Sequence, residues 1–336
     1  MKIERILIVG LGSIGRRHLA IIKELYPLIE IAVLRHNDLN KDANENVGVK
    51  ICTSSIDEVM LFKPQAAIIA NPASKHLVIA TKLANQGVHI LIEKPIADSS
   101  VGVSQLIDLC SKNKLVLMTG YNLRFLPSLI DFRNLINTNK VGNIFSIHAE
   151  VGQHLSDWRS DVDYKKTVSA KKELGGGILL ELSHEIDYLY WIFGPIKWVK
   201  SHVEKVSNLD IDVEDCANVI LGFEGSLGHK NTASLSMDCF RHDPVRKCIV
   251  IGESGTLKWN GISGEVKYYS KTGNGWEVLF SLKPNRDFTY IEEIKHFFFC
   301  IEEGKTSIVT GEDGLNAVHG VEAINRSNIN GGIVYL

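Results

Sequence analysis

The sequence predicts an α/β chain of two domains, the first built on a parallel sheet and the second an α+β domain with one large, mostly antiparallel sheet. Three observations support this prediction. Apolar runs typical of buried strands alternate with amphipathic helical segments up to about residue 120. A glycine-rich turn, GLGSIG at residues 10–15, joins the first of these runs to the first helix. Between residues 197 and 280, segments that alternate apolar and polar residues are separated by short turns, which is typical of an antiparallel meander.

The first domain is predicted to cover residues 1–121 and the second residues 122–336, and the length of the chain agrees with two domains. In the first domain, strands are predicted at residues 6–9, 30–34, 49–52, 66–70, 88–92 and 115–119. Helices are predicted at residues 16–26, 74–86 and 99–112, where apolar residues recur at helical spacing. Because strands and helices alternate, we expect a parallel sheet with helices on both faces.

The turn at residues 10–15 has the spacing G-x-G-x-x-G between a strand and a helix, which predicts a dinucleotide-binding Rossmann domain. Gly10 allows the tight turn, Gly12 lets the backbone approach a pyrophosphate, and Gly15 lets the helix pack close to the strand. The pyrophosphate would accept hydrogen bonds from backbone N–H groups at the start of the helix, where Ser13 and Ile14 lie. The alternative interpretation is a tight glycine turn that binds nothing.

Charge and composition argue against several classes of protein. The chain has 39 acidic and 37 basic residues, a net charge of −2, and no basic stripe, so nucleic acid is not an expected partner. The six cysteines are scattered without a C-x-x-C pair, which predicts free thiols in a reducing compartment and neither a zinc site nor a disulfide framework. No signal peptide or membrane span is visible, so we expect a soluble, cytoplasmic protein without a membrane partner.

Polar residues follow the fourth and fifth predicted strands, at the sheet edge where open α/β sheets bind their ligands. Asn71 and Pro72 end the fourth strand and are candidates for contact with a nicotinamide ribose, with His76 in the next helical turn. Glu93 and Lys94 end the fifth strand, and Lys94 is a candidate for proton transfer beside the cofactor. The alternatives are a solvated lysine at the strand end and a histidine that only packs against its own helix.

The end of the second predicted strand bears on the choice of nicotinamide cofactor. NAD-specific Rossmann domains usually place an acid there for the ribose 2′-hydroxyl, whereas this chain has Arg35 and His36. A cation at this position favours the 2′-phosphate of NADP, although Asp38 is close enough in sequence to serve NAD. We therefore expect NADP or NAD as cofactor, with NADP slightly favoured.

The second domain is predicted to contain fewer helices and many strands. Helices are expected at residues 126–136, 176–193, 288–303 and 311–328, and residues 153–174 are expected to be irregular. Strands are expected at residues 143–151, 199–206, 216–223, 232–238, 248–251, 256–259 and 266–269. Because such a sheet must cover its apolar outer side, this face is a candidate subunit interface.

A cluster of ionisable residues lies on the helix predicted at residues 176–193. This helix begins within a triple glycine at residues 175–177. Glu181, His184 and Asp187 are spaced three apart, so they share one helix face. His184 can relay protons near neutral pH, and a carboxylate beside it would fix its tautomer. The alternative is a packed or surface histidine. A metal site is not expected, because the cluster offers too few additional ligands.

Three motifs follow one another along the chain: GLGSIG at residues 10–15, EKP at residues 93–95, and GGG followed by His and Asp at residues 175–187. In these motifs the whole chain resembles the Gfo/Idh/MocA family, which includes glucose–fructose oxidoreductase and inositol dehydrogenase. In that family the EKP lysine is catalytic beside the nicotinamide, and the histidine of the second-domain helix acts on the substrate hydroxyl. The resemblance therefore implies that Lys94 and His184 are catalytic, and we expect Asp187 to orient the histidine. It also implies a homodimer or homotetramer formed through the second-domain sheet.

One departure from the family pattern concerns the acid before the histidine. Many members have an aspartate four residues ahead, where this chain has Leu180, and the nearest acid is Glu181, whose role stays open.

The segment YNLRFLP at residues 121–127 resembles the family's linker between domains, which places Asn122 and Arg124 among the candidate substrate contacts. Trp158 and Arg159 lie in a segment that resembles a substrate-side loop. Because guanidinium groups bind oxyanions in a bidentate manner, both arginines are candidates to hold a carboxylate or phosphate. The alternative for each arginine is a surface salt bridge.

The motifs together predict an NAD(P)-dependent oxidoreductase that transfers a hydride between nicotinamide and a hydroxyl or keto carbon of a sugar, cyclitol or sugar derivative. The expected partner is thus a small, polar, sugar-like substrate. One alternative is an enzyme of the dihydrodiol dehydrogenase or biliverdin reductase type, which the polar residues of the substrate loop disfavour. The other is a non-catalytic dinucleotide-sensing regulator, which the intact pair of Lys94 and His184 disfavours.

Overall fold

The computed structural model describes residues 2–35, 48–159, 162–224, 230–285 and 287–336. The chain forms two compact units, each described by itself below. Unit 1 comprises Met1–Tyr121 and Tyr290–Leu315, and unit 2 comprises Asn122–Thr289 and Asn316–Leu336. None of the helices formed by the described residues is long and apolar enough to cross a membrane.

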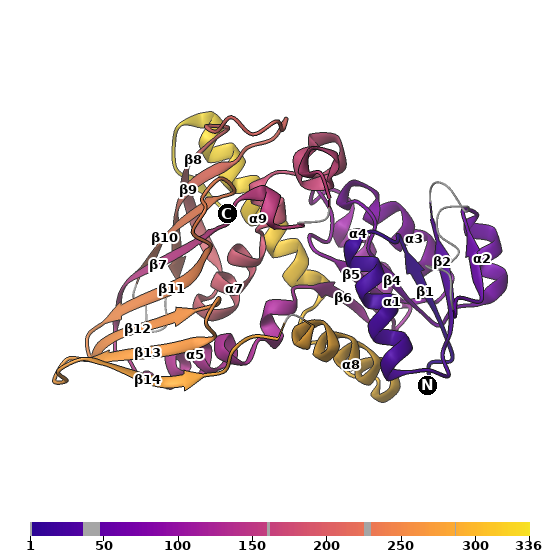
Figure 1. The fold of residues 1–336 in the computed structure, drawn as a ribbon, viewed down its shortest axis with the longest axis horizontal. Coiled ribbons are helices and arrows are strands. Elements are labelled where there is room, and N and C mark those ends of the chain that lie inside the picture. Colours follow the sequence, from indigo (N-terminus) through magenta and orange to yellow (C-terminus); the bar gives the residue numbers. More distant parts are fainter. Residues whose placement is uncertain (1, 36–47, 160–161, 225–229, 286) are drawn as a thin grey trace. The chain divides into compact units, whose positions relative to one another are not determined.

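Unit 1 is built on a six-stranded parallel sheet in the order β3-β2-β1-β4-β5-β6 (Figure 1). Its strands are β1 (Arg5–Val9), β2 (Glu30–Leu34), β3 (Ile51–Thr53), β4 (Ala66–Ile69), β5 (His89–Glu93) and β6 (Leu117–Gly120). This order reverses between β1 and β4, as in the Rossmann fold, where ligands bind beyond the carboxyl ends of the strands. The central strands β1 and β4 are apolar except for Arg5, because helices cover both faces of a parallel sheet.

In the part of unit 1 that the structure describes, five α-helices accompany this sheet: α1 (Ser13–Leu25), α2 (Ile56–Phe62), α3 (His76–Asn85), α4 (Val103–Lys112) and α8 (Phe288–Glu303). The short helix α2 is absent from the sequence prediction, because seven residues give too little periodicity to recognise. Helix α8 packs against α1, since the rings of Tyr26 and Phe298 lie with centroids 4.6 Å apart. The parallel sheet and its helices are thus the predicted Rossmann domain.

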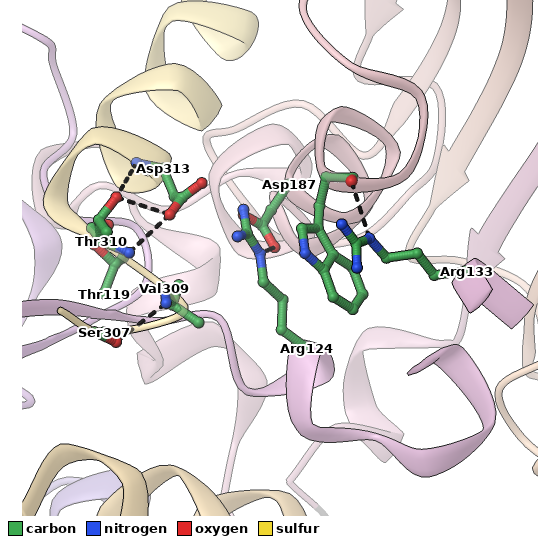
Figure 2. A network of polar contacts seen from close by, with 9 residues as sticks. Thr119, Arg124, Arg133, Asp187, Ser307, Val309, Thr310 and Asp313 are labelled. Carbon is green, nitrogen blue, oxygen red and sulfur yellow. Dashed lines mark hydrogen bonds and ion pairs between the residues drawn. The ribbon is translucent and has the colours of Figure 1, made fainter. Parts of the chain in front are cut away.

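Residues 290–315 belong to unit 1, which differs from the continuous second domain expected from the sequence. This stretch contains most of α8 and the segment that follows it. The segment is hydrogen-bonded to the edge strand β6, because Thr119 N donates to Val309 O at 3.3 Å. Next to this contact, Thr310 and Asp313 cap helix α9 (Gly311–Asn330) reciprocally, with Thr310 N to Asp313 Oδ2 at 2.7 Å and Asp313 N to Thr310 Oγ1 at 3.1 Å (Figure 2).

Unit 2 is built on a nine-stranded sheet in the order β14-β13-β12-β11-β7-β10-β9-β8-β15 (Figure 1). All neighbours in this sheet are antiparallel except β7 and β10, which pair in parallel. Its strands are β7 (Ile144–Gly152), β8 (Ile196–Glu204), β9 (Cys216–Glu224), β10 (Lys230–Asp238), β11 (Val245–Gly252), β12 (Gly255–Asn260), β13 (Glu265–Ser270), β14 (Trp276–Ser281) and β15 (Val334–Tyr335). The mostly antiparallel sheet confirms the predicted fold class.

One face of this sheet carries the core of unit 2. Buried residues of the strands pack there with those of α5 (Pro127–Asn137), α6 (Ile178–Glu181), α7 (His184–Phe193) and the later part of α9. The single helix predicted at residues 176–193 is in fact two helices, because the chain turns at Leu182 and Ser183. The Ser183 hydroxyl donates to Leu180 O at 2.9 Å, a local side-chain bond of the kind that competes with helix continuation.

Candidate active site

The glycine turn after β1 is tightly packed at both ends and open in the middle. Gly10 has a φ of +87°, and its N–H donates to Leu34 O at 2.9 Å. A Cβ atom added to Gly15 would lie 2.0 Å from Gly10 O, so no larger residue fits there. A Cβ atom on Gly12 would meet no atom within 4 Å. The first and third glycines are thus needed by the fold itself, whereas the second faces open space.

The start of α1 offers hydrogen-bond donors to an anion. The helix begins at Ser13, Gly12 provides no capping side chain, and no acidic residue lies in the first turn. The first N–H groups of a helix have no partner inside the helix, and the helix dipole favours negative charge beside them. The open space at Gly12 and these donors fit a dinucleotide pyrophosphate.

His76 connects the turns that follow β4 and β5. Its Nε2 lies 2.7 Å from Asn71 O and its Nδ1 lies 3.0 Å from Pro95 O, and the ring is buried. Burial lowers the pKa of His76, although the two carbonyl contacts act in the opposite direction. Because both ring nitrogens already face backbone carbonyls, the geometry favours a positioning role over direct contact with the cofactor. Its assignment to the cofactor site stays a prediction.

Asn71 and Lys94 lie at the carboxyl edge of the same sheet, after β4 and β5. The amide Oδ1 of Asn71 is buried without a hydrogen-bond partner among the described residues, and such an atom fits a ligand with N–H or O–H groups. Lys94 is half-buried, and its backbone N–H faces Glu93 Oε2 at 3.3 Å. Glu93 itself is buried, with its Oε1 atom 2.6 Å from His18 Nε2. Its carboxylate is therefore directed to α1.

The residues expected to select between NAD and NADP are only partly described. Arg35 follows β2 and is half-buried, which places it at the predicted edge of the sheet. His36 and Asp38 lie outside the described residues. The preference for NADP therefore stays a prediction.

In unit 2, Arg124 and Asp187 form a buried, bidentate ion pair (Figure 2). The Nε and one terminal N–H of Arg124 donate to the two oxygens of Asp187 at 3.0 and 2.6 Å, and the side chains are 3% and 1% exposed. Arg124 also lies 5.5 Å from the ring of Trp191, which Arg133 contacts as well. Asp187 lies in the first turn of α7, three residues after His184, so the pair ties the linker segment Asn122–Phe125 to the helix that begins with this histidine.

This pairing was not expected from the sequence. It occupies two donors of Arg124, which leaves the guanidinium less able to bind a substrate oxyanion than predicted. The roles predicted for Arg124 and Asp187 remain untested.

The triple glycine allows close approach between segments of unit 2. A Cβ atom on Gly176 would lie 2.3 Å from Val168 O, and one on Gly177 would lie 2.4 Å from Glu214 Oε1. The same Glu214 oxygen accepts a hydrogen bond from Leu179 N at 3.2 Å, and burial raises the pKa of the Glu214 carboxyl. The glycines therefore let the chain before His184 lie directly against Glu214.

The remaining predicted substrate residues differ in exposure. Asn122 is buried and donates to Thr289 Oγ1 at 2.9 Å. Trp158 and Arg159 are half-buried, with Trp158 Nε1 donating to Gln153 O at 3.0 Å and Arg159 facing Ser169 Oγ at 3.4 Å. Glu181 and His184 are half-buried as well. Of these residues, Asn122 is the least accessible to a substrate.

Two ionisable residues of unit 1 were not singled out from the sequence. His18 lies on α1 one turn after Gly15, and Glu293 lies on α8, and both are fully buried close to Glu93. Glu293 falls on the buried stripe of α8 that includes Ile294, Phe297 and Ile301. A glutamate in an apolar stripe is a signal that helical periodicity makes visible in the sequence.

The strand order and the open glycine turn define a nucleotide-binding Rossmann protein with a second α/β domain. Two family models match the chain: the oxidoreductase family with an NAD-binding Rossmann fold over residues 4–121, and the C-terminal alpha/beta domain of the same family over residues 133–336. The chain belongs to the Gfo/Idh/MocA oxidoreductase family. These matches confirm the predicted family and fold class, those of an oxidoreductase family with an NAD-binding Rossmann domain.

Among curated proteins, the chain is 25% identical to a myo-inositol 2-dehydrogenase of Thermotoga maritima over 94% of this chain and 93% of the relative. It is 26% identical to the rhizopine catabolism protein MocA of Rhizobium meliloti over 56% of this chain. The chain spans about half the length of MocA, and also about half the length of a similar uncharacterized oxidoreductase of Streptococcus pneumoniae. A solved levoglucosan dehydrogenase in complex with NADH shares the fold, with a TM-score of 0.85, 20% identity and coverage of 98% of each chain.

Proposed function

We propose that this chain transfers a hydride between a nicotinamide dinucleotide and a hydroxyl or keto carbon of a sugar, cyclitol or sugar derivative. The observation that carries the proposal is the open space at Gly12, beside the donors of α1 and at the sheet edge that also holds Asn71 and Lys94. The names of a myo-inositol 2-dehydrogenase and a levoglucosan dehydrogenase among the similar proteins support a polyol or sugar as substrate.

Each residue of unit 1 has a distinct role in this proposal. The bound nicotinamide supplies the hydride acceptor or donor. The N–H groups that follow Gly12 hold the pyrophosphate, and the buried amide oxygen of Asn71 accepts a hydrogen bond from the cofactor. Lys94 moves the proton of the reacting hydroxyl, because an amine at this edge can act as a general acid or base.

In unit 2, His184 binds the substrate hydroxyl and shares in its proton transfer. The ion pair of Arg124 with Asp187 fixes the first turn of α7, and this orients the imidazole. Trp158 and Arg159 are exposed enough to contact a polar substrate.

The test is a turnover assay with NAD and NADP against a panel of sugars, cyclitols and their oxidised forms. We expect activity with at least one polyol, and a loss of about 10²- to 10⁴-fold in Lys94→Met and in His184→Asn, the range typical of general acid–base residues. Lys112→Met, which removes an exposed lysine of α4, is the matched control and should keep full activity. Full turnover in both Lys94→Met and His184→Asn would refute the assigned roles.

We further propose that NADP is the preferred cofactor and that Arg35 contacts its 2′-phosphate. The support is the place of this arginine directly after β2, where NAD-specific domains carry an acid. Arg35→Ala should then weaken NADPH binding by about tenfold or more and leave NADH binding nearly unchanged, because a charge-assisted pair contributes roughly 1.5–3 kcal/mol. Equal weakening of both cofactors would argue against a 2′-phosphate contact.

We also propose that unit 2 mediates a homodimer or homotetramer through the outer face of its sheet. The support is a set of exposed apolar side chains on this face: Ile220, Ile251, Tyr269, Trp276 and Val278. Sedimentation of the wild type and of Ile220→Glu tests the proposal. We expect the wild type to sediment as an oligomer and the variant to shift toward monomer, whereas a monomeric wild type would refute it.

A further inference from the structure

Three ionisable side chains from three elements of unit 1 meet in its interior. One of them, Glu93, directly precedes Lys94 in the sequence. His18 comes from α1, Glu93 from the end of β5 and Glu293 from α8. One ligand-type atom of each lies within 4.8 Å of the others. The side chains are almost completely buried, with 0% of His18, 8% of Glu93 and 0% of Glu293 exposed.

The two carboxyl groups have different surroundings. Glu93 Oε1 lies 2.6 Å from His18 Nε2, so this carboxylate has a hydrogen-bond donor. Neither oxygen of Glu293 has a hydrogen-bond donor among the described residues. The other titratable group of α8 near this site is Tyr290, which packs edge-on against His18 and under Arg17, whose Cζ lies 4.8 Å from the tyrosine ring. The charge of Glu93 acts on Glu293, and the charges of both glutamates act on Tyr290.

An ionised Glu293 would leave two negative carboxylates in one buried site. Burial raises the pKa of Glu293 well above its usual value, and the nearby charge of Glu93 raises it further. Two carboxyl groups that share a buried site in this way no longer repel each other as two charges when one of them is protonated.

A bound divalent cation would also neutralise two carboxylates, but the geometry disfavours it. The 2.6 Å between His18 Nε2 and Glu93 Oε1 is a hydrogen-bond distance. Two ligands of one tetrahedral zinc ion, each at about 2.0–2.1 Å from the metal, lie about 3.3 Å apart. The observed cluster therefore fits a protonated carboxyl group better than a bound metal ion.

We propose that Glu293 is a neutral acid beside Glu93, and that it is thereby a positioning residue for Lys94. The first half of this proposal depends on the cluster alone, and the second half rests on the proposed function of Lys94. No covalent step is involved, because the proton stays on Glu293.

Glu93 is a suitable link because its own position is tightly constrained. It pairs with Gly120 of β6, where an added Cβ atom would lie 3.1 Å from both the Cα and the Oε2 of Glu93. The same Oε2 accepts from the backbone N–H of Lys94 at 3.3 Å. If Glu293 kept no proton, repulsion would push the Glu93 carboxylate against its neighbours and move the backbone that carries Lys94.

Stability against pH tests the proton without any need for turnover. A carboxyl whose pKa is raised in the folded state favours folding below its unfolded pKa, and this contribution is lost as the pH rises toward the folded pKa. Glu293→Gln abolishes this titration and keeps an N–H donor for Glu93. Relative to the wild type, we expect the melting temperature of Glu293→Gln to rise between about pH 5 and about pH 8.

Glu185→Gln is the matched control, because Glu185 is a fully buried glutamate of unit 2 that pairs with Arg246 at 2.8 Å. Its melting temperature should lie below that of the wild type across the same pH range. If Glu293→Gln behaved like Glu185→Gln at about pH 8, Glu293 would be ionised and the proposal wrong. Stabilisation of the wild type by millimolar zinc, magnesium or manganese that is lost in Glu293→Gln would overturn it as well.

Infrared spectroscopy tests the proton in the wild type directly. A protonated, buried carboxylic acid has a carbonyl band apart from that of carboxylates, and this band should be present near pH 7, shift in D₂O and disappear in Glu293→Gln. Its absence from the wild type near pH 7 would contradict the neutral acid.

Kinetics with the substrate found by the turnover assay tests the positioning role. Glu293→Met removes the neutral acid, and we expect kcat to fall by about tenfold to a hundredfold with a shifted pH profile, as for a displaced catalytic group. Glu293→Gln should restore most of this loss, because its amide donates to Glu93. If Glu293→Met kept the wild-type kcat and pH profile, the positioning role would be wrong. A wild type without turnover would refute the proposed function and leave the pH and infrared results unaffected.

Discussion

Both units bury carboxyl groups almost completely, but the two units give these groups different neighbours. In unit 2, Asp187 faces Arg124 and Glu185 faces Arg246, each within 2.8 Å. In unit 1, Glu293 faces a second carboxyl group, that of Glu93. A buried carboxylate beside an arginine remains ionised, whereas one beside another carboxylate is stabilised by binding a proton. A buried carboxyl group is therefore ionised in unit 2 and, in our proposal, neutral in unit 1, and its neighbours decide which.

The largest loss of stability should follow from breaking the most deeply buried ion pair. Asp187→Asn leaves the charge of Arg124 in a site where only 3% of its side chain is exposed. Removing one partner of a buried pair costs about 3–5 kcal/mol, because the remaining charge stays uncompensated. Urea denaturation at neutral pH measures this change, and a loss below about 1 kcal/mol would contradict an ionised, buried pair.

Removing both charges should cost less than removing one. The double variant Arg124→Met/Asp187→Leu leaves no isolated charge, and buried pairs replaced by apolar residues are often neutral or more stable. We expect its free energy of unfolding to exceed that of Asp187→Asn. A double variant less stable than the single one would show that shape, and not charge, dominates at this pair.

Breaking the second pair of unit 2 should have a smaller effect. Glu185→Gln leaves Arg246, whose side chain is 24% exposed and reaches solvent. We expect a loss of about 1–3 kcal/mol, the cost of one unsatisfied buried donor. Urea denaturation of Asp187→Asn and Glu185→Gln under the same conditions tests this order. Equal losses in the free energy of unfolding would show that the exposure of the remaining arginine does not set the loss.

In unit 1, Glu93→Gln should change stability less than either variant of unit 2. It weakens the hydrogen bond with His18, which costs roughly 1 kcal/mol, but it also removes the repulsion from Glu293. Because the two effects oppose each other, the net change at neutral pH is small. A loss as large as that of Asp187→Asn would mean that Glu93 forms a full ion pair with His18 and that Glu293 is irrelevant to it.

The smallest effect belongs to a pair at the surface. Lys197 and Glu224 lie 2.9 Å apart, with side chains 47% and 70% exposed. Solvent and salt screen such a pair, so Lys197→Ala should change the melting temperature within experimental error. A clear loss would show that distance alone, and not burial, sets the energy of ion pairs in this chain.

The sequence predicts features that depend on neighbouring residues. The strand β1, the glycine turn and helix α1 follow from an apolar run, a fixed glycine spacing and a helical stripe. The split of the predicted helix at Ser183 was missed, because the apolar pattern does not show the local side-chain bond to Leu180 that competes with helix continuation. The place of residues 290–315 in unit 1 was missed because contacts with β6 and α1 join segments far apart in the sequence.

The features of the candidate site also divide into those that the sequence predicts and those that it does not. The common place of Gly12, Asn71 and Lys94 at one edge of the sheet could be predicted, because the carboxyl ends of parallel strands meet there. Their roles stay predictions. The pairing of Arg124 with Asp187 and the meeting of Glu93 with Glu293 were not found. In each case, the packing of helices and strands that are far apart in the sequence determines which charged groups meet in the interior. The spacing of residues along the chain does not predict this packing.

The most direct test of the whole account is a fluorescence titration of NADH and NADPH into the wild type, Gly12→Val and Gly275→Val. Gly12 has a φ of −68° and Gly275 lacks a positive φ, and an added Cβ atom meets nothing within 4 Å at either position, so both variants should fold. We predict that the wild type and Gly275→Val bind at least one of the two cofactors and that Gly12→Val does not, because its side chain fills the space for the pyrophosphate. Binding of neither cofactor by the wild type, or equal binding by Gly12→Val, would contradict the account.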